Sequence, residues 1–253
     1  MTLAPVVFDA PPVNPAPNGL YAVTSWVTDE IPRWLPEGVQ VRPFNYGGAF
    51  GVWEPDWDAA EDDLSGDDAK AGERPDLLDP FVQATIWGAD ESPVEDITVE
   101  EAKQRAEQNL RLNAPIELEK LFAARMISDS PVNPTVADIV EAVGWLEMQF
   151  AATNTLGFIH ASPTLAAQAA QAQLIVRTGA GLKTPLGHTW VFGGGYEDGL
   201  GLKVTGTSQP YGWRTNVEVR GDVDTGHHKF AAVAEQSFVI GYETMIGYAD
   251  LDD

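Results

Sequence analysis

The alternation of hydrophobic and polar residues predicts short strands in the first third of the chain, an alternation of helices and strands in the middle, and mainly strands in the last third. In the first third, the pattern predicts short strands at residues 20–26, 39–44, 50–53 and 81–87. Gly47 and Gly48 supply a bend between the second and third of these. We therefore expect a long two-stranded excursion from the body of the molecule.

The clearest helix pattern covers residues 98–127. Thr98 is followed three residues later by Glu101, the spacing of a capping box, in which two side chains satisfy free backbone N–H groups at the helix start. Apolar residues then recur every three or four positions and continue beyond Pro115. The pattern predicts a kinked helix of about 28 residues, or two abutting helices, against a mean of about 11–12 residues. We expect this helix to act as a spine.

A second amphipathic helix is predicted after the spine. Thr135 is its expected cap, and residues 136–150 carry one apolar stripe. Residues 157–161 have the pattern of a short buried strand. The middle of the chain therefore alternates between helix and strand.

The last third of the chain is predicted to consist mainly of strands. Ser162 followed by Pro163 marks the start of one more helix, over residues 164–173. Strand patterns then follow at residues 188–192, 202–205, 217–219 and 230–242. The order of helices and strands predicts an α+β fold.

Two segments are compositionally biased. Residues 1–19 contain five prolines, so we expect an extended arm, which is either a disordered tail or a segment held by a neighbouring subunit. Residues 54–79 contain eleven carboxylates against Lys70 and Arg74. Because so many like charges cannot be buried together, this segment must project into solvent as a loop.

Composition excludes several classes of protein. The 253 residues include 38 acidic and 15 basic ones, and the formal charge of -23 disfavours wrapping by nucleic acid. The absence of cysteine excludes disulfide scaffolds and thiolate sites. The N-terminal segment lacks the pattern of a signal peptide, and no stretch approaches 18 apolar residues. We expect a soluble protein made in a cytoplasm, with no membrane partner.

Glycines and histidines offer little chemistry. The run 193–195, with Gly199 and Gly201, lacks the lysine and Ser/Thr of a phosphate-binding loop, and no helix pattern follows it, so we expect a tight turn. The four histidines, none in a His-Glu-x-x-His pattern, are His160, His188, His227 and His228. We expect His160 to be a hydrogen-bonded core or interface residue, and the adjacent pair at 227 and 228 to face opposite ways on a strand.

The acidic loop does not match a known site either. Counted from Asp56, positions six and twelve of a calcium-binding EF-hand loop would be Glu61 and Asp67, where that loop requires Gly and Glu. Paired carboxylates and eight scattered tryptophans leave open a carbohydrate-active enzyme with its acids in residues 54–63. No Gly-x-Ser-x-Gly elbow is present. We predict no catalytic, cofactor or metal site.

The order of the elements resembles the major capsid proteins of tailed bacteriophages, whose Hong Kong phage-type shell fold is shared with encapsulins. Three stretches carry the resemblance: residues 135–163, 186–192 and 230–242. The resemblance implies an N-terminal arm (1–40), an extended loop with an acidic tip (41–90), a peripheral domain containing the spine helix (91–134 and 216–253) and an axial domain (135–215).

The resemblance also implies a function. The chain would be a non-enzymatic subunit of an icosahedral head shell, assembled from hexamers and pentamers in a bacterial cytoplasm. It would enclose double-stranded DNA without specific binding, with scaffold, portal and decoration proteins as further partners. Some family members crosslink a lysine to an asparagine; the loop offers only Lys70, and we predict no crosslink. An encapsulin-like shell, a decoration or tail protein and an acidic carbohydrate-active enzyme remain alternatives.

Overall fold

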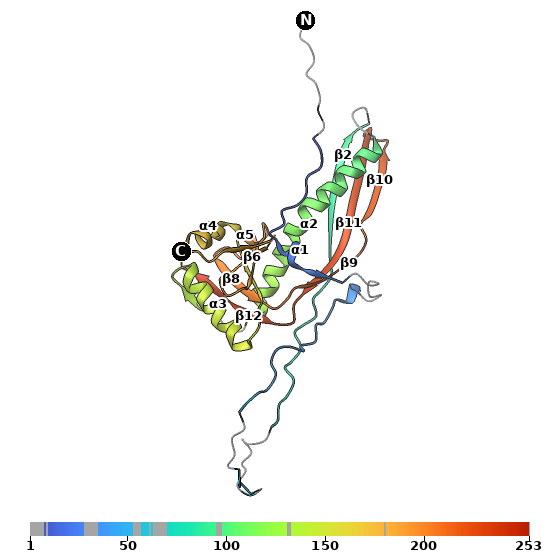
Figure 1. Cartoon of the computed structure of the whole chain (residues 1–253). Helices are drawn as coiled ribbons and strands as arrows, with labels where there is room; N and C mark the ends of the chain where they lie inside the picture. Colours follow the sequence, from blue (N-terminus) through green and yellow to red (C-terminus); the bar gives the residue numbers. More distant parts are fainter. Residues whose placement is uncertain are drawn as a thin grey trace.

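The computed structural model describes residues 8, 10–27, 35–52, 57–60, 62, 70–94, 98–130, 133–179 and 181–252. A long helix, α2 (Val99–Asp129), lies along one sheet and continues towards a second sheet beside it (Figure 1). Two segments leave this body: the N-terminal segment and a long loop between Val41 and Leu78, of which residues 41–52, 57–60, 62 and 70–78 are described. They project towards opposite ends of the molecule in this view.

The first sheet is built on one long central strand, β11. Strand β2 runs antiparallel along it on one side, with Ala234 opposite Gly88, and β10 and β9 pair with it elsewhere. The short β1 completes the sheet by pairing in parallel with β9. The five strands are β1 (Ser25–Trp26), β2 (Ala84–Pro93), β9 (Tyr211–Arg214), β10 (Glu218–Asp224) and β11 (Lys229–Gly241).

The second sheet has seven strands in the order β3-β12-β8-β4-β7-β6-β5. Helix α3 (Ile139–Thr153) packs on it, and Phe150 and Ile159 are fully buried between them. Its strands are β3 (Thr135–Val136), β4 (Phe158–Ala161), β5 (Val176–Thr178), β6 (Gly181–Lys183), β7 (Thr189–Phe192), β8 (Lys203–Thr207) and β12 (Met245–Leu251). The short helices are α1 (Leu20–Val23), η1 (Leu35–Glu37), η4 (Pro163–Leu165), α4 (Ala166–Gln171) and α5 (Tyr196–Gly199).

The spine helix is confirmed as one element of 31 residues, so the alternative of two abutting helices is wrong. The Thr98 hydroxyl accepts the predicted hydrogen bond from the Glu101 N–H at 3.2 Å. Pro115 lies inside the helix without ending it. Small side chains, including Ala102 and Ala106, form its buried face and allow the helix to lie close to the first sheet.

Several predictions in the first third are wrong. Residues 20–23 form helix α1 rather than the start of a strand. Residues 39–44 and 50–52 form no strand; Val39 makes a single bridge to Phe81, and Trp53 lies outside the described residues. The alternating pattern correctly indicated one buried face, because Val39 and Val41 pack against a core cluster. A strand also needs a neighbouring strand for its backbone, and among these described residues Val39 alone has one, in its bridge to Phe81.

Three local predictions also need correction. Thr135 lies in β3, and the cap of α3 is Asp138, whose carboxylate accepts from the N–H groups of Val140 and Glu141. A one-turn helix, α5, does follow the glycine run. The two adjacent histidines lie in the turn between β10 and β11, with His228 at a φ of 52°, and not on a strand.

The other predicted elements of the middle and late chain are confirmed, whereas strands β3, β5, β6, β9 and β12 were not predicted. Strand β4, the Ser162 cap and strand β7 lie where the pattern placed them. Strands β8, β10 and β11 begin within one residue of the expected position. Residues 216–253 divide between the two sheets, because β12 pairs with β8 instead of with β10 or β11.

Candidate interaction surfaces

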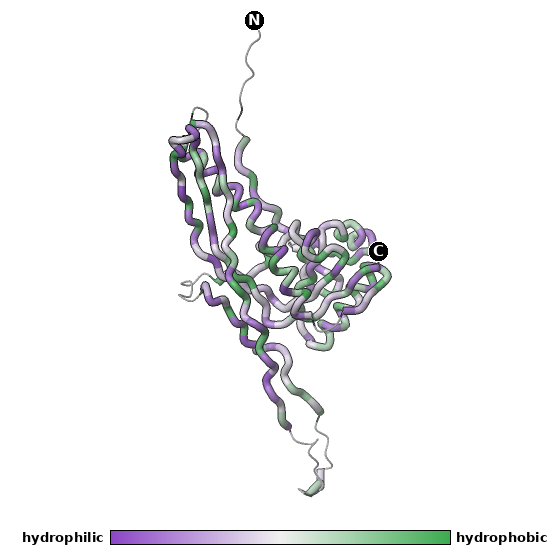
Figure 2. Tube along the Cα trace, turned by 180° about the vertical axis from the view of Figure 1, so that it is seen from behind, coloured by the Kyte–Doolittle hydropathy of each residue, from purple (hydrophilic) through white to green (hydrophobic). Residues whose placement is uncertain are grey.

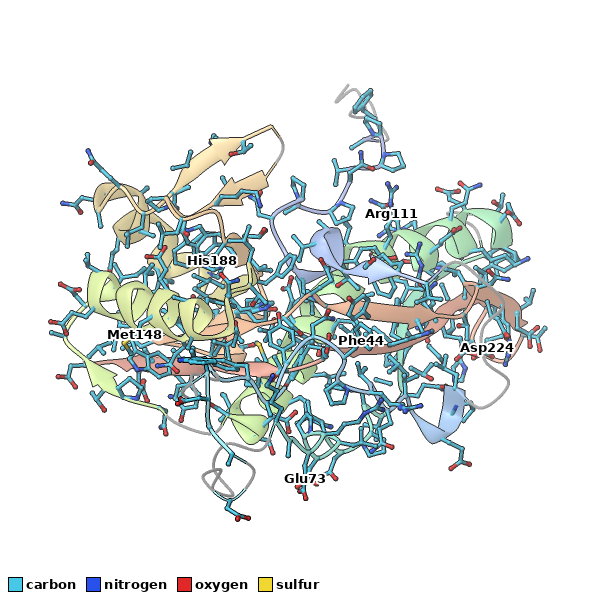
Figure 3. All side chains as sticks on the ribbon, turned by 60° about the horizontal axis from the view of Figure 1, so that its bottom comes forward. Phe44, Glu73, Arg111, Met148, His188 and Asp224 are labelled. Carbon is cyan, nitrogen blue, oxygen red and sulfur yellow. The ribbon has the colours of Figure 1, made fainter. Side chains whose placement is uncertain are left out.

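The projecting loop exposes large apolar side chains to solvent. Phe44, Phe50 and Trp57 are 93, 95 and 97% exposed. Hydrophobic and hydrophilic segments succeed one another along this loop (Figure 2), and Glu73 lies on it, away from both sheets (Figure 3). The described part of the acidic run contains a turn at residues 57–58 and one 3-10 position at residue 62, and most of its residues are exposed, which confirms the predicted solvent-exposed loop for them. Isolated exposed apolar residues are ordinary, but several on one projecting segment indicate an interaction surface.

The root of the loop is held by Glu243, in the turn between β11 and β12. Its carboxylate accepts hydrogen bonds from the backbone N–H groups of Phe44 and Asn45, and from the Asn45 side-chain amide at 2.8 Å. The Glu243 N–H itself donates to the Ser208 hydroxyl at 3.0 Å, which fixes the turn. Burial by itself raises the pKa of Glu243, but the hydrogen bonds from Asn45 and Phe44 outweigh it and hold the pKa below its ordinary value.

The root of the N-terminal segment is held by Glu119, in the middle of α2. Glu119 is only 2% exposed. One carboxylate oxygen accepts from the Leu20 N–H and the other from the Gly195 N–H, both at 2.9 Å. Burial raises the pKa of Glu119, and the two hydrogen bonds oppose this rise in part.

Glycines make room for this carboxylate. A Cβ on Gly19 would collide with Glu119 Oε1, and a Cβ on Gly193 would collide with the whole carboxylate. The glycine run predicted as a tight turn is therefore also one wall of the cradle around Glu119. Sequence analysis missed this glutamate, although it interrupts an apolar stripe between Leu118 and Phe122. A charged residue at a buried helix position was the available signal.

The N-terminal segment then runs along the spine helix. Gln108 donates its amide to the Val13 carbonyl at 2.7 Å, and Arg111 donates to the Asn14 side chain. The Phe192 N–H donates to the Asn18 carbonyl at 2.9 Å. Residues 13, 14 and 18 are thus attached to the body. The predicted extended arm is confirmed for residues 10–16, which have no regular structure, whereas residues 17–19 form a turn that leads into α1.

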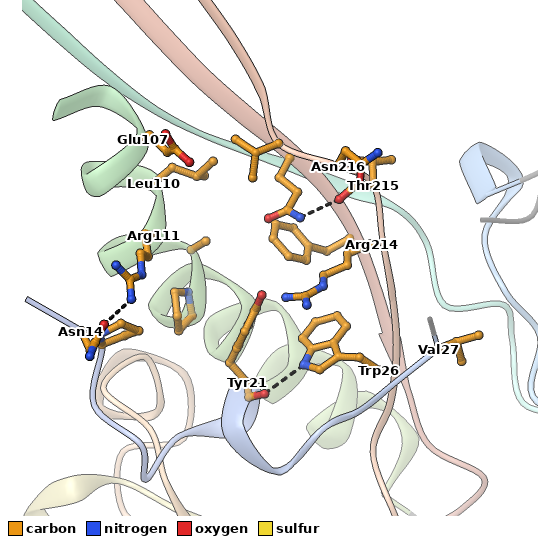
Figure 4. A pocket seen from close by; sticks show the side chains of 16 residues that line it. Asn14, Tyr21, Trp26, Val27, Glu107, Leu110, Arg111, Arg214, Thr215 and Asn216 are labelled. Carbon is orange, nitrogen blue, oxygen red and sulfur yellow. Dashed lines mark hydrogen bonds between the residues drawn. The ribbon is translucent and has the colours of Figure 1, made fainter. Parts of the chain in front are cut away.

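A groove of about 940 Å³ opens between this segment, α2 and the first sheet (Figure 4). The Arg214 guanidinium lies 4.8 Å from the Trp26 ring centroid and 5.3 Å from that of Tyr21. Among the described residues, neither Arg214 nor Arg111 forms an ion pair with a carboxylate. The lining also includes Glu107, so the groove carries two arginines against one carboxylate in a chain that is strongly acidic as a whole.

Two of the histidines, His160 and His188, are buried and hydrogen-bonded. His160 is fully buried, with its ring nitrogens 2.9 Å from the Tyr196 hydroxyl and 2.8 Å from the Thr207 hydroxyl, which confirms a hydrogen-bonded core histidine. Burial lowers its pKa to about 3. His188 stacks on Phe150 and accepts the Gly157 N–H at 3.2 Å.

Over the residues that the structure describes, no group of three or more His, Asp or Glu side chains could hold a metal ion. Among the same residues, no helix is long and apolar enough to cross a membrane. Asp56 lies outside the described residues, and Asp58 is exposed.

Comparison with solved structures identifies the fold. No protein-family model and no curated protein matches this sequence. A structure from Mycobacterium phage Adephagia matches with a TM-score of 0.54 and 14% identity, over 97% of this chain and 92% of that one. One from Mycobacterium phage Bobi has a TM-score of 0.53 and 13% identity, over 100% and 95%. The capsid of a native GTA particle has a TM-score of 0.54 and 9% identity, over 98% and 94%.

These matches extend over nearly the whole of each chain. They therefore include the order of the helices and strands and not one domain alone. The chain has the Hong Kong phage-type shell fold, in agreement with the resemblance found in the sequence. At this level of identity the match defines the fold, and the function has to be argued from the surfaces described above.

Proposed function

We propose that this chain is the structural subunit that self-assembles into the icosahedral head shell of a tailed bacteriophage and encloses double-stranded DNA. One observation carries the proposal: the chain matches the capsid of a GTA particle over 98% of its length. The anchored projections with exposed apolar residues support it, because such surfaces gain stability when a neighbouring copy covers them.

The proposal assigns the chain's function to interfaces between copies instead of to a catalytic pocket. Hexamers and pentamers of the chain would form the shell, and scaffold, portal and decoration proteins would act on it during assembly in the host cytoplasm. The formal charge of -23 supports enclosure without specific binding, since a strongly negative wall does not adhere to DNA phosphates. The mature chain would reside in the virion.

Within this proposal the chain divides as the resemblance implies. Residues 1–40 form the arm, 41–90 the extended loop, 91–134 and 216–253 the peripheral domain, and 135–215 the axial domain. Strand β12 then connects the domains, since it follows β11 of the first sheet and pairs with β8 of the second. The proposed shell carries no crosslink through Lys70, so denatured particles should give the intact mass of a single chain.

The assembly state of the purified chain tests the proposal. Light scattering and negative-stain electron microscopy should show hollow icosahedral particles. A variant lacking residues 48–74 should stay folded but form no closed particles, because it loses the exposed loop and keeps both sheets together with Tyr46 and Leu78, which pack against the cores. Particles from the natural source should protect DNA from nuclease. A wild-type chain that remains a monomer at high concentration and high salt would contradict self-assembly.

A further inference from the structure

Both projecting segments are attached at their roots in the same way. At each root, a carboxylate from the body accepts backbone N–H groups of the segment: Glu119 from Leu20, and Glu243 from Phe44 and Asn45. Neither carboxylate forms an ion pair with a basic side chain among the described residues. Backbone N–H groups therefore balance the two charges, and such bonds are directional.

Glu119 fixes the positions of two segments that pack against the spine helix. Its two oxygens are used by different segments, Leu20 in the arm root and Gly195 in the turn after β7. Because Gly19 and Gly193 leave no space for a further side-chain atom, the carboxylate has little freedom to move. The arm root, the spine helix and the second sheet therefore meet at one side chain.

The geometry at Glu243 differs in what it stabilises. Phe44, whose N–H it accepts, has a side chain that is 93% exposed, so this contact covers little apolar surface. The neighbouring Tyr46 packs against the core of the second sheet, and the loop beyond it leaves the body. Glu243 thus holds the backbone at the point where the loop leaves the body. Its main effect is to fix the direction in which the loop extends.

We propose that Glu119 and Glu243 are positioning residues that set the directions in which the arm and the loop leave the subunit. Assembly depends on them because a projection reaches its place on a neighbouring copy only from the correct direction. The expected effect on assembly rests on the proposed shell function. The anchoring itself can be measured on the subunit alone.

The experiment compares three variants of the full chain: Glu243→Ala, Glu119→Gln and, as a matched control, Asp138→Ala. Asp138 also accepts two backbone N–H groups, but it does so within the body at the start of α3. Amide hydrogen exchange should become about tenfold faster or more at Phe44 and Asn45 in the first variant. In the second it should do so at either Leu20 or Gly195, because a side-chain amide keeps one acceptor oxygen where the carboxylate had two. The control should leave these amides unchanged.

Assembly is then measured on the same proteins. Glu243→Ala should keep the wild-type unfolding temperature within the range of the control, yet give open or mixed-size particles. Two results would overturn the inference. One is uniform particles of wild-type size from a variant in which the amides at the root of the segment exchange faster. The other is wild-type exchange of these amides in the variants. If the wild type itself forms no particles, the proposed function fails. Amide hydrogen exchange and small-angle scattering of the subunit would still show whether Glu119 and Glu243 anchor the two segments.

Glu119→Gln carries a risk of unfolding because the side chain is buried. Gly19→Ala provides a second route, since its added Cβ would displace the Glu119 carboxylate without removing it. This variant should release Leu20 and disturb assembly, because the added Cβ collides with Oε1, the oxygen that accepts the Leu20 N–H. Wild-type exchange at Leu20 in Gly19→Ala would contradict the assignment of Glu119.

Discussion

The imidazole of His160 shows how a polar residue is accommodated in the core of this protein. It lies on β4 in the second sheet, and its ring nitrogens meet the hydroxyls of Tyr196 and Thr207. Both partners are neutral, so nothing compensates the charge of an imidazolium, and burial lowers the pKa of His160 to about 3. The His160 side chain is therefore neutral at all ordinary pH values and acts only through its hydrogen bonds.

This low pKa predicts a dependence of stability on pH. Between about pH 6.5 and pH 3 the unfolded chain binds a proton at His160 and the folded chain does not, so the free energy of unfolding falls as the pH falls. From pH 7 to pH 5 this residue should contribute a loss of about 2 kcal/mol. Urea unfolding of the wild type and of His160→Gln at both pH values measures it. Equal pH dependence in the two proteins would refute the assignment.

At the scale of elements, the spine helix depends on close contact with a strand. A Cβ on Gly88 of β2 would lie 2.7 Å from the Ala106 carbonyl oxygen and collide with the Leu110 N–H. Helix α2 can therefore approach the first sheet only because position 88 has no side chain. The helix pattern in the sequence located α2, but the strand that receives it became apparent only from the packing.

Two glycine substitutions test this contact. Gly88→Ala should lower the free energy of unfolding by about 1–3 kcal/mol, because the helix must move away from the sheet. Gly144→Ala, in α3, is the matched control: a Cβ there meets nothing within 4 Å, so it should raise stability by about 0.5–1 kcal/mol. Chemical denaturation measures both. A neutral Gly88→Ala would show that the helix is not held by this contact.

At the scale of the whole molecule, charge opposes association. Copies with a formal charge of -23 repel one another, whereas the exposed apolar residues of the loop favour burial. The balance depends on ionic strength, because salt screens charge repulsion and leaves the hydrophobic contribution largely intact.

We therefore expect salt to promote assembly. Raising NaCl from about 0.1 M to about 1 M shortens the screening length from about 10 Å to about 3 Å and should increase the fraction of particles seen by light scattering. A variant with Asp58, Asp62, Glu73 and Asp76 changed to their amides should assemble at lower salt. Dissociation of wild-type particles by salt would instead show that ion pairs hold them together.

The sequence by itself determined the elements whose signals are local. The 3.6-residue period and the Thr98 cap located α2, and Ser162 with Pro163 located the start of the next helix. The order of these elements was sufficient to identify the shell fold, because element order is a property of the chain and not of packing. The acidic run also predicted the solvent exposure of those of its residues that the structure describes.

Only the tertiary structure decided what the remaining polar residues do. The roles of Glu119 and Glu243 depend on partners 99 and 198–199 residues away in the chain, which no local pattern connects. The pattern at residues 39–52 indicated strands, but apart from the bridge between Val39 and Phe81 these residues pair with no strand. Val41 and Tyr46 are half-buried against the core, whereas Phe44 and Phe50 are exposed. The anchoring of the two projections is thus set by long-range contacts, while the elements themselves are set by short-range ones.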